Sequence, residues 1–329
     1  MSSRRADHAG SWYSSNGKQL DQQLSGWLEA TASPKEGEAL REAPVKGCKA
    51  IIGPHAGYSY SGPAAAFAYK CIDIESISRV FVLGPSHHVY LDGCALSQCK
   101  TYDTPIGQLP LDLDTIEELK RSGKFELMDQ DTDEAEHRYI RKVFEGRDIR
   151  IVPILVGSIS TASEKSFGRL LAPYLADPST LFVISSDFCH WGTRFRYTHF
   201  HPPDTDDLTL GTSLTSGTFS SVVGSSGAQV WQGIEKLDKL GMEAISFDGR
   251  TKKASQAHDD FAAYLRQTRN TICGRHPIGV LLGAVAALEE QAEGAWRCEW
   301  VRYEQSSRVK RLADSSVSYA SAFVAFSSS

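Results

Sequence analysis

The sequence predicts an α/β fold built on one central, mostly parallel but mixed β-sheet flanked by helices. Apolar, β-rich runs alternate with segments of helical periodicity, as expected when helices connect the strands of one sheet. Two runs, IRIVPILVG at 149–157 and TLFVIS at 180–185, are almost continuously apolar. Such runs are typical of strands that are buried on both faces.

The same patterns predict the order of the elements. Strands are expected at 48–53, 79–84, 125–128, 149–157 and 180–185, and two closing strands at 296–303 and 316–326 are expected to pair antiparallel. Helices are expected at 64–69, 113–122, 163–175, 230–240, 255–267 and 277–291. Ser163 suits the N-cap of the third helix, and Pro173 predicts a kink or an early end there.

The segment 211–227 has a composition unlike the rest of the chain. Of its 17 residues, 13 are Ser, Thr or Gly, which bury too little apolar surface to offset the entropy of ordering. With its flanks, 202–229 is therefore predicted to be a flexible surface insertion. The whole chain, residues 1–329, is predicted to form a single domain that carries this insertion. The reason is that the candidate site residues described below come from distant parts of the chain and would be gathered by one sheet.

Composition and charge exclude several classes of protein. The net charge is -5 and the pI is about 6.1, without a basic stripe, so no nucleic-acid partner is expected. The longest apolar stretch, 278–288, is shorter than the about 20 residues that cross a bilayer, so no membrane insertion is expected. Seven cysteines without a CxxC pair favour free thiols in a reducing compartment. We expect a cytoplasmic protein, with the nucleus as a second compartment.

Histidines follow three predicted strands at their carboxyl ends, where ligands bind in open α/β sheets. These are His55, His87 and His190, after the strands at 48–53, 79–84 and 180–185. One histidine at a strand end is more often structural, but three at equivalent positions favour a functional cluster. Asp187 is expected to orient His190 through a hydrogen bond; the alternative is an ordinary turn residue.

Cys273 is the fourth candidate. It lies just before a predicted helix, beside Arg275 and His276, where the helix N-terminus and the cations favour the thiolate. The alternative is a small packing residue, as isolated cysteines often are. Together with the imidazoles it could complete a His/His/Cys metal site, because both ligand types suit iron, copper or zinc.

Six motifs together resemble the Memo family, named for mediating cell motility driven by receptor tyrosine kinases. They occur in order between about residue 8 and residue 325: HAGSWY at 8–13, PHAGY at 54–58, LGPSHH at 83–88, SSDFCHWG at 185–192, CGRHPIG at 273–279 and DSSVSY at 314–319. The resemblance implies the fold of class III extradiol ring-cleaving dioxygenases, a single α/β domain with a central mixed sheet and one pocket.

The resemblance also implies an iron or copper site. Its ligands are the positions matching His55, His87 and Cys273, with Asp187 and His190 nearby. The related dioxygenases have a Glu where Cys273 stands and keep a catalytic base at the position of His190. Because a thiolate is softer and can itself be oxidised, ring cleavage is not expected. The predicted role is a metal-binding protein with a redox function in signalling or metal homeostasis.

A second function implied by the resemblance is non-enzymatic. Memo-like proteins have been linked to phosphotyrosine peptides through this pocket, at the positions matching Trp12, His55, His87, His190 and Cys273. The alternative prediction is therefore an adaptor that binds phosphorylated or anionic signalling peptides. A third, an inert vestigial site, also stays open.

The chain departs from the family pattern in two places. It passes directly from His137 to Arg138, where family members carry a further Ser-x-Glu-x-His-Leu-Pro-type stretch. The Ser/Thr/Gly-rich insertion at 211–227 is extra. A surface loop of this kind is expected to leave the site intact.

Overall fold

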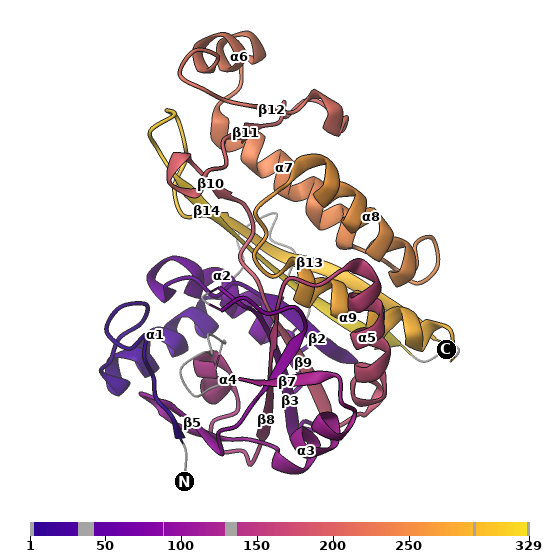
Figure 1. Cartoon of the computed structure of the whole chain (residues 1–329). Coiled ribbons are helices and arrows are strands. Elements are labelled where there is room, and N and C mark those ends of the chain that lie inside the picture. Colours follow the sequence, from indigo (N-terminus) through magenta and orange to yellow (C-terminus); the bar gives the residue numbers. More distant parts are fainter. Residues whose placement is uncertain (1–2, 32–42, 88, 129–136, 292–293, 328–329) are drawn as a thin grey trace.

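A mixed β-sheet runs through the centre of the molecule, with helices on both sides (Figure 1). The computed structural model describes residues 3–31, 43–87, 89–128, 137–291 and 294–327, and in these ranges the sheet has nine strands. Its parallel centre consists of β2 (Cys48–Gly53), β9 (Thr180–Ser185), β3 (Arg79–Pro85) and β8 (Arg150–Val156), in that spatial order. The predicted α/β fold is confirmed.

Antiparallel strands extend the sheet on both sides, as predicted for the closing pair. On one side are β14 (Ser316–Ser327), which pairs with β2, then β13 (Ala295–Gln305) and β10 (His190–Trp191), which both pair with β14. On the other side β4 (Cys94–Ser97) pairs with β8 and carries β7 (Phe125–Met128). Two smaller sheets join β1 (Ser3–Arg4), β5 (Thr101–Thr104) and β6 (Gly107–Pro110), and β11 (His199–Phe200) with β12 (Thr212–Ser213).

The helices form a layer on each face of the sheet (Figure 1). On one face, α2 (Tyr58–Lys70) contacts β2 and β14, and α1 (Gly17–Ala30) and α4 (His137–Val143) pack against it. On the other, α5 (Thr161–Ala176) and α9 (Arg275–Glu289) pack on each other and on β9. Beyond α9 lie α7 (Val230–Ile245) and α8 (Ala254–Thr268), and α3 (Leu113–Arg121) precedes β7.

Several element boundaries differ from the prediction. α5 begins earlier because Ser160, not Ser163, is its N-cap; the Ser160 hydroxyl accepts a bond from the Ser163 N–H at 3.1 Å. The helix also continues through Pro173 to Ala176, since the proline falls in its last turn and breaks little of the ladder. α2 begins at Tyr58, well before the predicted start, and α9 begins at Arg275, two residues early.

The segment 202–229 contains secondary structure that its composition did not predict. A short 3₁₀ helix (Leu208–Leu210) and β12 precede α6 (Phe219–Ser226), which projects from the molecule at the top of Figure 1. Phe219, Val222 and Val223 pack partly against the core. These few apolar residues supply the contact face that the Ser, Thr and Gly residues around them lack.

The acidic run 131–136 lies outside the described residues, but the chain that follows is tightly packed. Tyr139 on α4 is buried, stacks on Tyr69 at 4.8 Å between ring centroids, and donates to the Gly62 carbonyl. The part of the chain that departs from the family pattern therefore leads directly into a helix anchored on α2.

Glycines allow α5 and α9 to approach closely. A Cβ on Gly168 of α5 would lie 2.5 Å from the backbone nitrogen of Ala284 on α9. Side chains at this crossing would push α9 away from the sheet. Because α9 begins beside the candidate site, this packing fixes where its first turn lies.

We expect Gly168→Ala to lower the free energy of unfolding by about 1–3 kcal/mol, the usual cost of overpacking a core. Gly26→Ala on α1 is the matched control: a Cβ there meets nothing within 4 Å, so helix propensity should stabilise the protein by about 0.5–1 kcal/mol. Urea unfolding followed by circular dichroism measures both. Equal stability of the two variants would contradict the close packing.

Asp238 of α7 is fully buried and ties together two segments beside the candidate site. Its Oδ1 accepts bonds from the Asn270 amide at 3.0 Å and from the Cys189 N–H at 3.3 Å. The Tyr303 hydroxyl donates to Oδ2 at 2.9 Å. Burial raises the pKa of Asp238 to about 6, although bonds from neutral donors partly oppose the rise.

This raised pKa predicts a pH-dependent stability. Because folded Asp238 holds its proton more tightly than the unfolded chain, its contribution is lost as pH rises between about 4 and 6, up to about 3 kcal/mol. Asp238→Asn keeps an acceptor for Cys189 but cannot ionise. Urea unfolding across this pH range should show a smaller decline for the variant than for the native protein; parallel declines would rule the effect out.

Candidate metal centre

The sheet topology brings the predicted histidines to one edge. His55, His87 and Asp187 each stand two residues beyond the ends of the strands β2, β3 and β9. These strands are parallel neighbours, so their carboxyl ends meet. Cys273 reaches the same edge from the loop before α9. The structure thus brings His55, His87 and Cys273 together, and His190, at the start of β10, lines the same cavity.

His55, His87 and Cys273 form a group with the geometry of a metal site. One ligand atom from each lies within 4.8 Å of the others. His55 Nε2 and Cys273 Sγ are 3.3 Å apart, and the two imidazole rings lie edge to face with centroids 5.1 Å apart. Metal–nitrogen and metal–sulfur bonds of tetrahedral sites imply ligand separations of about 3.3–3.6 Å. The donor set therefore fits one transition metal ion after a small closure of the side chains.

His55 is oriented by groups behind it. Its Nδ1 lies 2.8 Å from the Ser185 hydroxyl, which leaves Nε2 toward Cys273. Asp187 Oδ1 accepts bonds from the backbone N–H groups of His55, at 2.9 Å, and Ala56, at 3.3 Å. The structure thus corrects the predicted role of Asp187: it holds the loop that carries His55, whereas other groups orient His190.

His190 is fixed by two backbone carbonyls. Its Nδ1 lies 2.9 Å from the Phe188 oxygen and 3.1 Å from the Thr271 oxygen. Because both partners can only accept, Nδ1 carries the proton and Nε2 carries the lone pair. The Thr271 hydroxyl accepts the His190 N–H at 2.8 Å and reinforces this placement.

Cys273 approaches the end of β9 because a glycine follows it. A Cβ on Gly274 would lie 2.5 Å from the Ser185 oxygen, and the Gly274 N–H donates to the Ser186 hydroxyl at 3.0 Å. The Asp187 N–H donates to Cys273 Sγ at 3.1 Å.

The expectation that Cys273 is a thiolate is wrong for the metal-free protein. Burial, and next the negative charge of Asp187, raise the pKa of the thiol well above its usual range. These two effects outweigh the helix N-terminus and the cations on which the prediction rested. A bound cation would supply the missing positive charge.

A cavity of about 340 Å³ opens onto this group. Its lining includes His87, Cys273, His190, Arg275 and His276, together with Ser86, Ser158, Thr271 and Phe195. His55 is buried behind it. Trp12, predicted to contact a ligand here, is instead 36% exposed, stacks on His8 and lines a different cavity.

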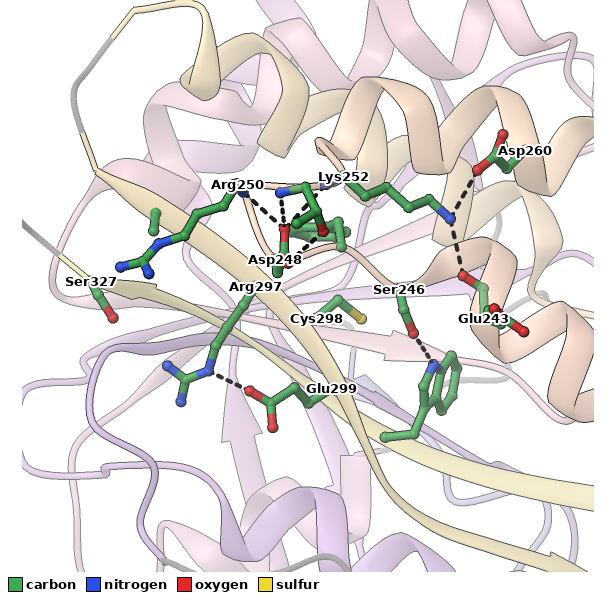
Figure 2. Close-up of a pocket in the computed structure, with 14 residues that line it drawn as sticks. Glu243, Ser246, Asp248, Arg250, Lys252, Asp260, Arg297, Cys298, Glu299 and Ser327 are labelled. Atoms are coloured by element: carbon green, nitrogen blue, oxygen red, sulfur yellow. Dashed lines mark hydrogen bonds and ion pairs between the residues drawn. The ribbon is translucent and has the colours of Figure 1, made fainter.

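A larger cavity, of about 1000 Å³, lies beside β13 and is drawn in Figure 2. Its charged groups serve the local fold. Asp248 accepts three backbone N–H bonds from its own turn, Lys252 pairs with Asp260 at 2.9 Å and bonds carbonyls at the end of α7, and Arg297 pairs with Glu299 (Figure 2). The cluster of His55, His87 and Cys273 lies instead at the smaller cavity, whose lining includes His87 and Cys273.

Sequence reasoning missed the residues that orient the histidines. Ser185 and Thr271 carry no motif spacing of their own. Ser185 is the last residue of its strand, next to the polar strand end, and Thr271 lies two residues before Cys273. Their positions beside recognised candidates are the signal that could have pointed to them.

No helix in the described ranges is long and apolar enough to cross a membrane.

The chain is similar to known proteins over nearly its whole length. The family model of Memo-like proteins matches residues 4–323. Protein MEMO1 of Homo sapiens is 42% identical over 325 residues, covering 96% of this chain and 95% of the relative. Protein memo-1 homolog of Caenorhabditis elegans is 40% identical over 324 residues, covering 97% and 81%. The uncharacterized protein JW3007 of Escherichia coli K12, a solved structure, is 15% identical with a TM-score of 0.39, over 83% of this chain and 98% of that one. From the family match and the full-length relatives, the chain belongs to the Memo family.

Proposed function

We propose that this protein binds one iron or copper ion through His55, His87 and Cys273 and uses it in redox chemistry. The observation that carries the proposal is the cluster of two imidazoles and one thiol at a single sheet edge, facing a cavity. Three protein ligands leave at least one coordination position for an exogenous ligand. The cavity gives such a ligand a place to bind.

The donor set suits the proposed redox metals. Imidazole and thiolate both bind iron and copper, and zinc, which also accepts these ligands, is the alternative without redox chemistry. His190, with its Nε2 lone pair, is proposed as a candidate acid–base group, one of two imidazoles with Nδ1 bonded that line the cavity, and Asp187 as the residue that positions the ligand loop. Because a thiolate replaces the usual carboxylate, we do not propose ring cleavage.

Loss of the ligands should abolish metal binding. We expect protein purified anaerobically to hold about one iron or copper ion per chain, and His55→Ala or Cys273→Ser to weaken the affinity by at least about 100-fold. Elemental analysis and competition with a chelator measure this. Copper loading should give a thiolate-to-metal absorption band that Cys273→Ser removes.

Cys298→Ala, which removes a free buried thiol in another cavity, is the matched control and should retain the metal. Native protein without iron or copper, or unchanged content in both ligand variants, would refute the metal site.

An adaptor function is the second candidate. The observation that favours it is Arg275, which lines the same cavity in the first turn of α9, beside three imidazoles. A helix N-terminus and cationic side chains favour an anionic group such as phosphate. Trp12, exposed on the N-terminal loop, is proposed as a further peptide contact.

Calorimetry with a phosphotyrosine peptide and its unphosphorylated twin separates the two functions. If the protein is an adaptor, the phosphopeptide binds at least about tenfold more tightly and Arg275→Gln removes the difference. Lys165→Gln, which removes an exposed cation on α5 away from the cavity lining, is the control. Equal affinity for the two peptides would count against the adaptor.

The seven cysteines support a proposal about the compartment. All of them lie in the described ranges and all are free thiols. Since unpaired buried thiols persist in reducing surroundings, we propose a cytoplasmic protein, with the nucleus as a second compartment.

A further inference from the structure

A buried carboxylate contacts two histidines next to the cavity of about 340 Å³ that opens onto His55, His87 and Cys273. We call this cavity the metal cavity. Glu164, in the first turn of α5, lies between α8 and α9 with a side chain 8% exposed. One oxygen is 2.7 Å from Nδ1 of His276 on α9, and the other is 2.9 Å from Nε2 of His258 on α8. We call Glu164, His258 and His276 the glutamate cluster.

Several features keep this carboxylate ionised although it is buried. Burial alone would raise the pKa of Glu164, but the hydrogen bond from His276, the close contact with His258 and the positive charge that either imidazole carries when protonated lower it below the usual value. Glu164 also lies in the first turn of its own helix and faces the first turns of α9, where helix dipoles favour negative charge. The chain leaves room for it: a Cβ on Gly279 of α9 would collide with the carboxylate.

His276 places this cluster in contact with two cavities. It lines the metal cavity together with His87, Cys273 and His190, and also a second cavity of about 360 Å³ that contains Glu164 and His258. Its side chain is 17% exposed. Because an ionised carboxylate only accepts, Nδ1 of His276 carries the proton and Nε2 carries the lone pair.

The metal cavity therefore contains two imidazoles with a free Nε2 lone pair but different support. A positive charge on His190 would face two neutral carbonyl oxygens. A positive charge on His276 would face the ionised Glu164 carboxylate at 2.7 Å. The same arrangement of carboxylate and imidazole orients and stabilises the acid–base histidine of hydrolytic triads.

We propose that His276 accepts and returns the proton of a protic ligand bound beside His55, His87 and Cys273, and that Glu164 is its positioning residue. The inference rests on the proposed metal site. The bond between the acidic hydrogen and the ligand breaks, the electron pair stays on the ligand as an anion, and the proton bonds to Nε2 of His276. When the ligand leaves, the proton returns to it. The ligand class is a small molecule with an ionisable O–H or N–H group.

The test loads the full-length protein with Co(II), which is not oxidised or reduced by a neighbouring thiolate under anaerobic conditions. Azide is the probe, and its binding is followed through the visible spectrum of the cobalt. If the azide anion binds together with a proton on His276, its Kd rises with pH, by about tenfold per pH unit where the dependence is steepest. In His276→Gln the Kd should be nearly independent of pH.

Two further variants assign the proton. Glu164→Gln should keep cobalt but weaken the coupling and displace it to lower pH, because the imidazolium loses its charged partner. His190→Gln separates the two candidate imidazoles: if His276 is the acceptor, this variant keeps the pH dependence of the azide Kd even where it weakens azide binding. His199→Gln, which removes a half-buried imidazole on β11 outside the cavity lining, is the control and should behave as the native protein.

The inference is overturned if His276→Gln keeps the native pH dependence, or if only His190→Gln loses it. Nitrogen NMR of the metal-free native protein is an independent check: a proton on Nε2 of His276 in place of Nδ1 would also overturn it. Cobalt content is measured in each sample. Failure of the native protein to bind cobalt would refute the metal site itself, which is a different result from normal binding without coupling.

Discussion

The close approach of the chain at Gly274 to the end of β9 is the constraint on which the site depends. A side chain at that position would collide with the Ser185 oxygen, so the loop before α9 could not lie against the sheet. With glycine there, the Ser186 hydroxyl and the Asp187 N–H bond to Gly274 and Cys273 directly. The same loop carries Thr271, which holds His190, and leads into α9, which carries His276. One backbone contact thus places the thiol and two imidazoles.

The sequence predicts those residues of the site that directly follow the strands of the sheet. His55, His87 and Asp187 follow from a simple rule, because each stands two residues beyond a parallel strand and neighbouring strands end together. The family motifs then add Cys273. The rest depends on contacts between distant segments: nothing in the local pattern tells that Asp187 bonds the His55 loop or that Thr271 faces His190.

The fold was predictable to a similar extent and for a similar reason. Strands that are buried on both faces form almost continuous apolar runs in the sequence. The centre of the sheet and the antiparallel closing pair could therefore be predicted. The predicted helix ends were less accurate. At the start of α5, Ser160 and Ser163 are both suitable N-cap residues, and only the hydrogen bond in the structure identifies Ser160 as the cap. Helix α6 was missed because its stability depends on three apolar residues that pack against the core of the folded protein. This tertiary contact cannot be read from a Ser-rich segment alone.

Two buried carboxylates near the site show how partners decide the charge of a side chain. Asp238 is held by neutral amides and a hydroxyl, and burial therefore raises its pKa to about 6. Glu164 is held by two imidazoles near two helix N-termini, and its pKa is lowered although it is buried too. The ionised carboxylate contacts His276 directly, whereas Asp238 bonds the backbone N–H of Cys189, next to His190, and the side-chain amide of Asn270, next to Thr271. The two imidazoles that share the cavity are consequently distinct, one supported by a charge and one by neutral dipoles. For the proposed proton transfer, this difference in support is what makes one of the two imidazoles the acceptor.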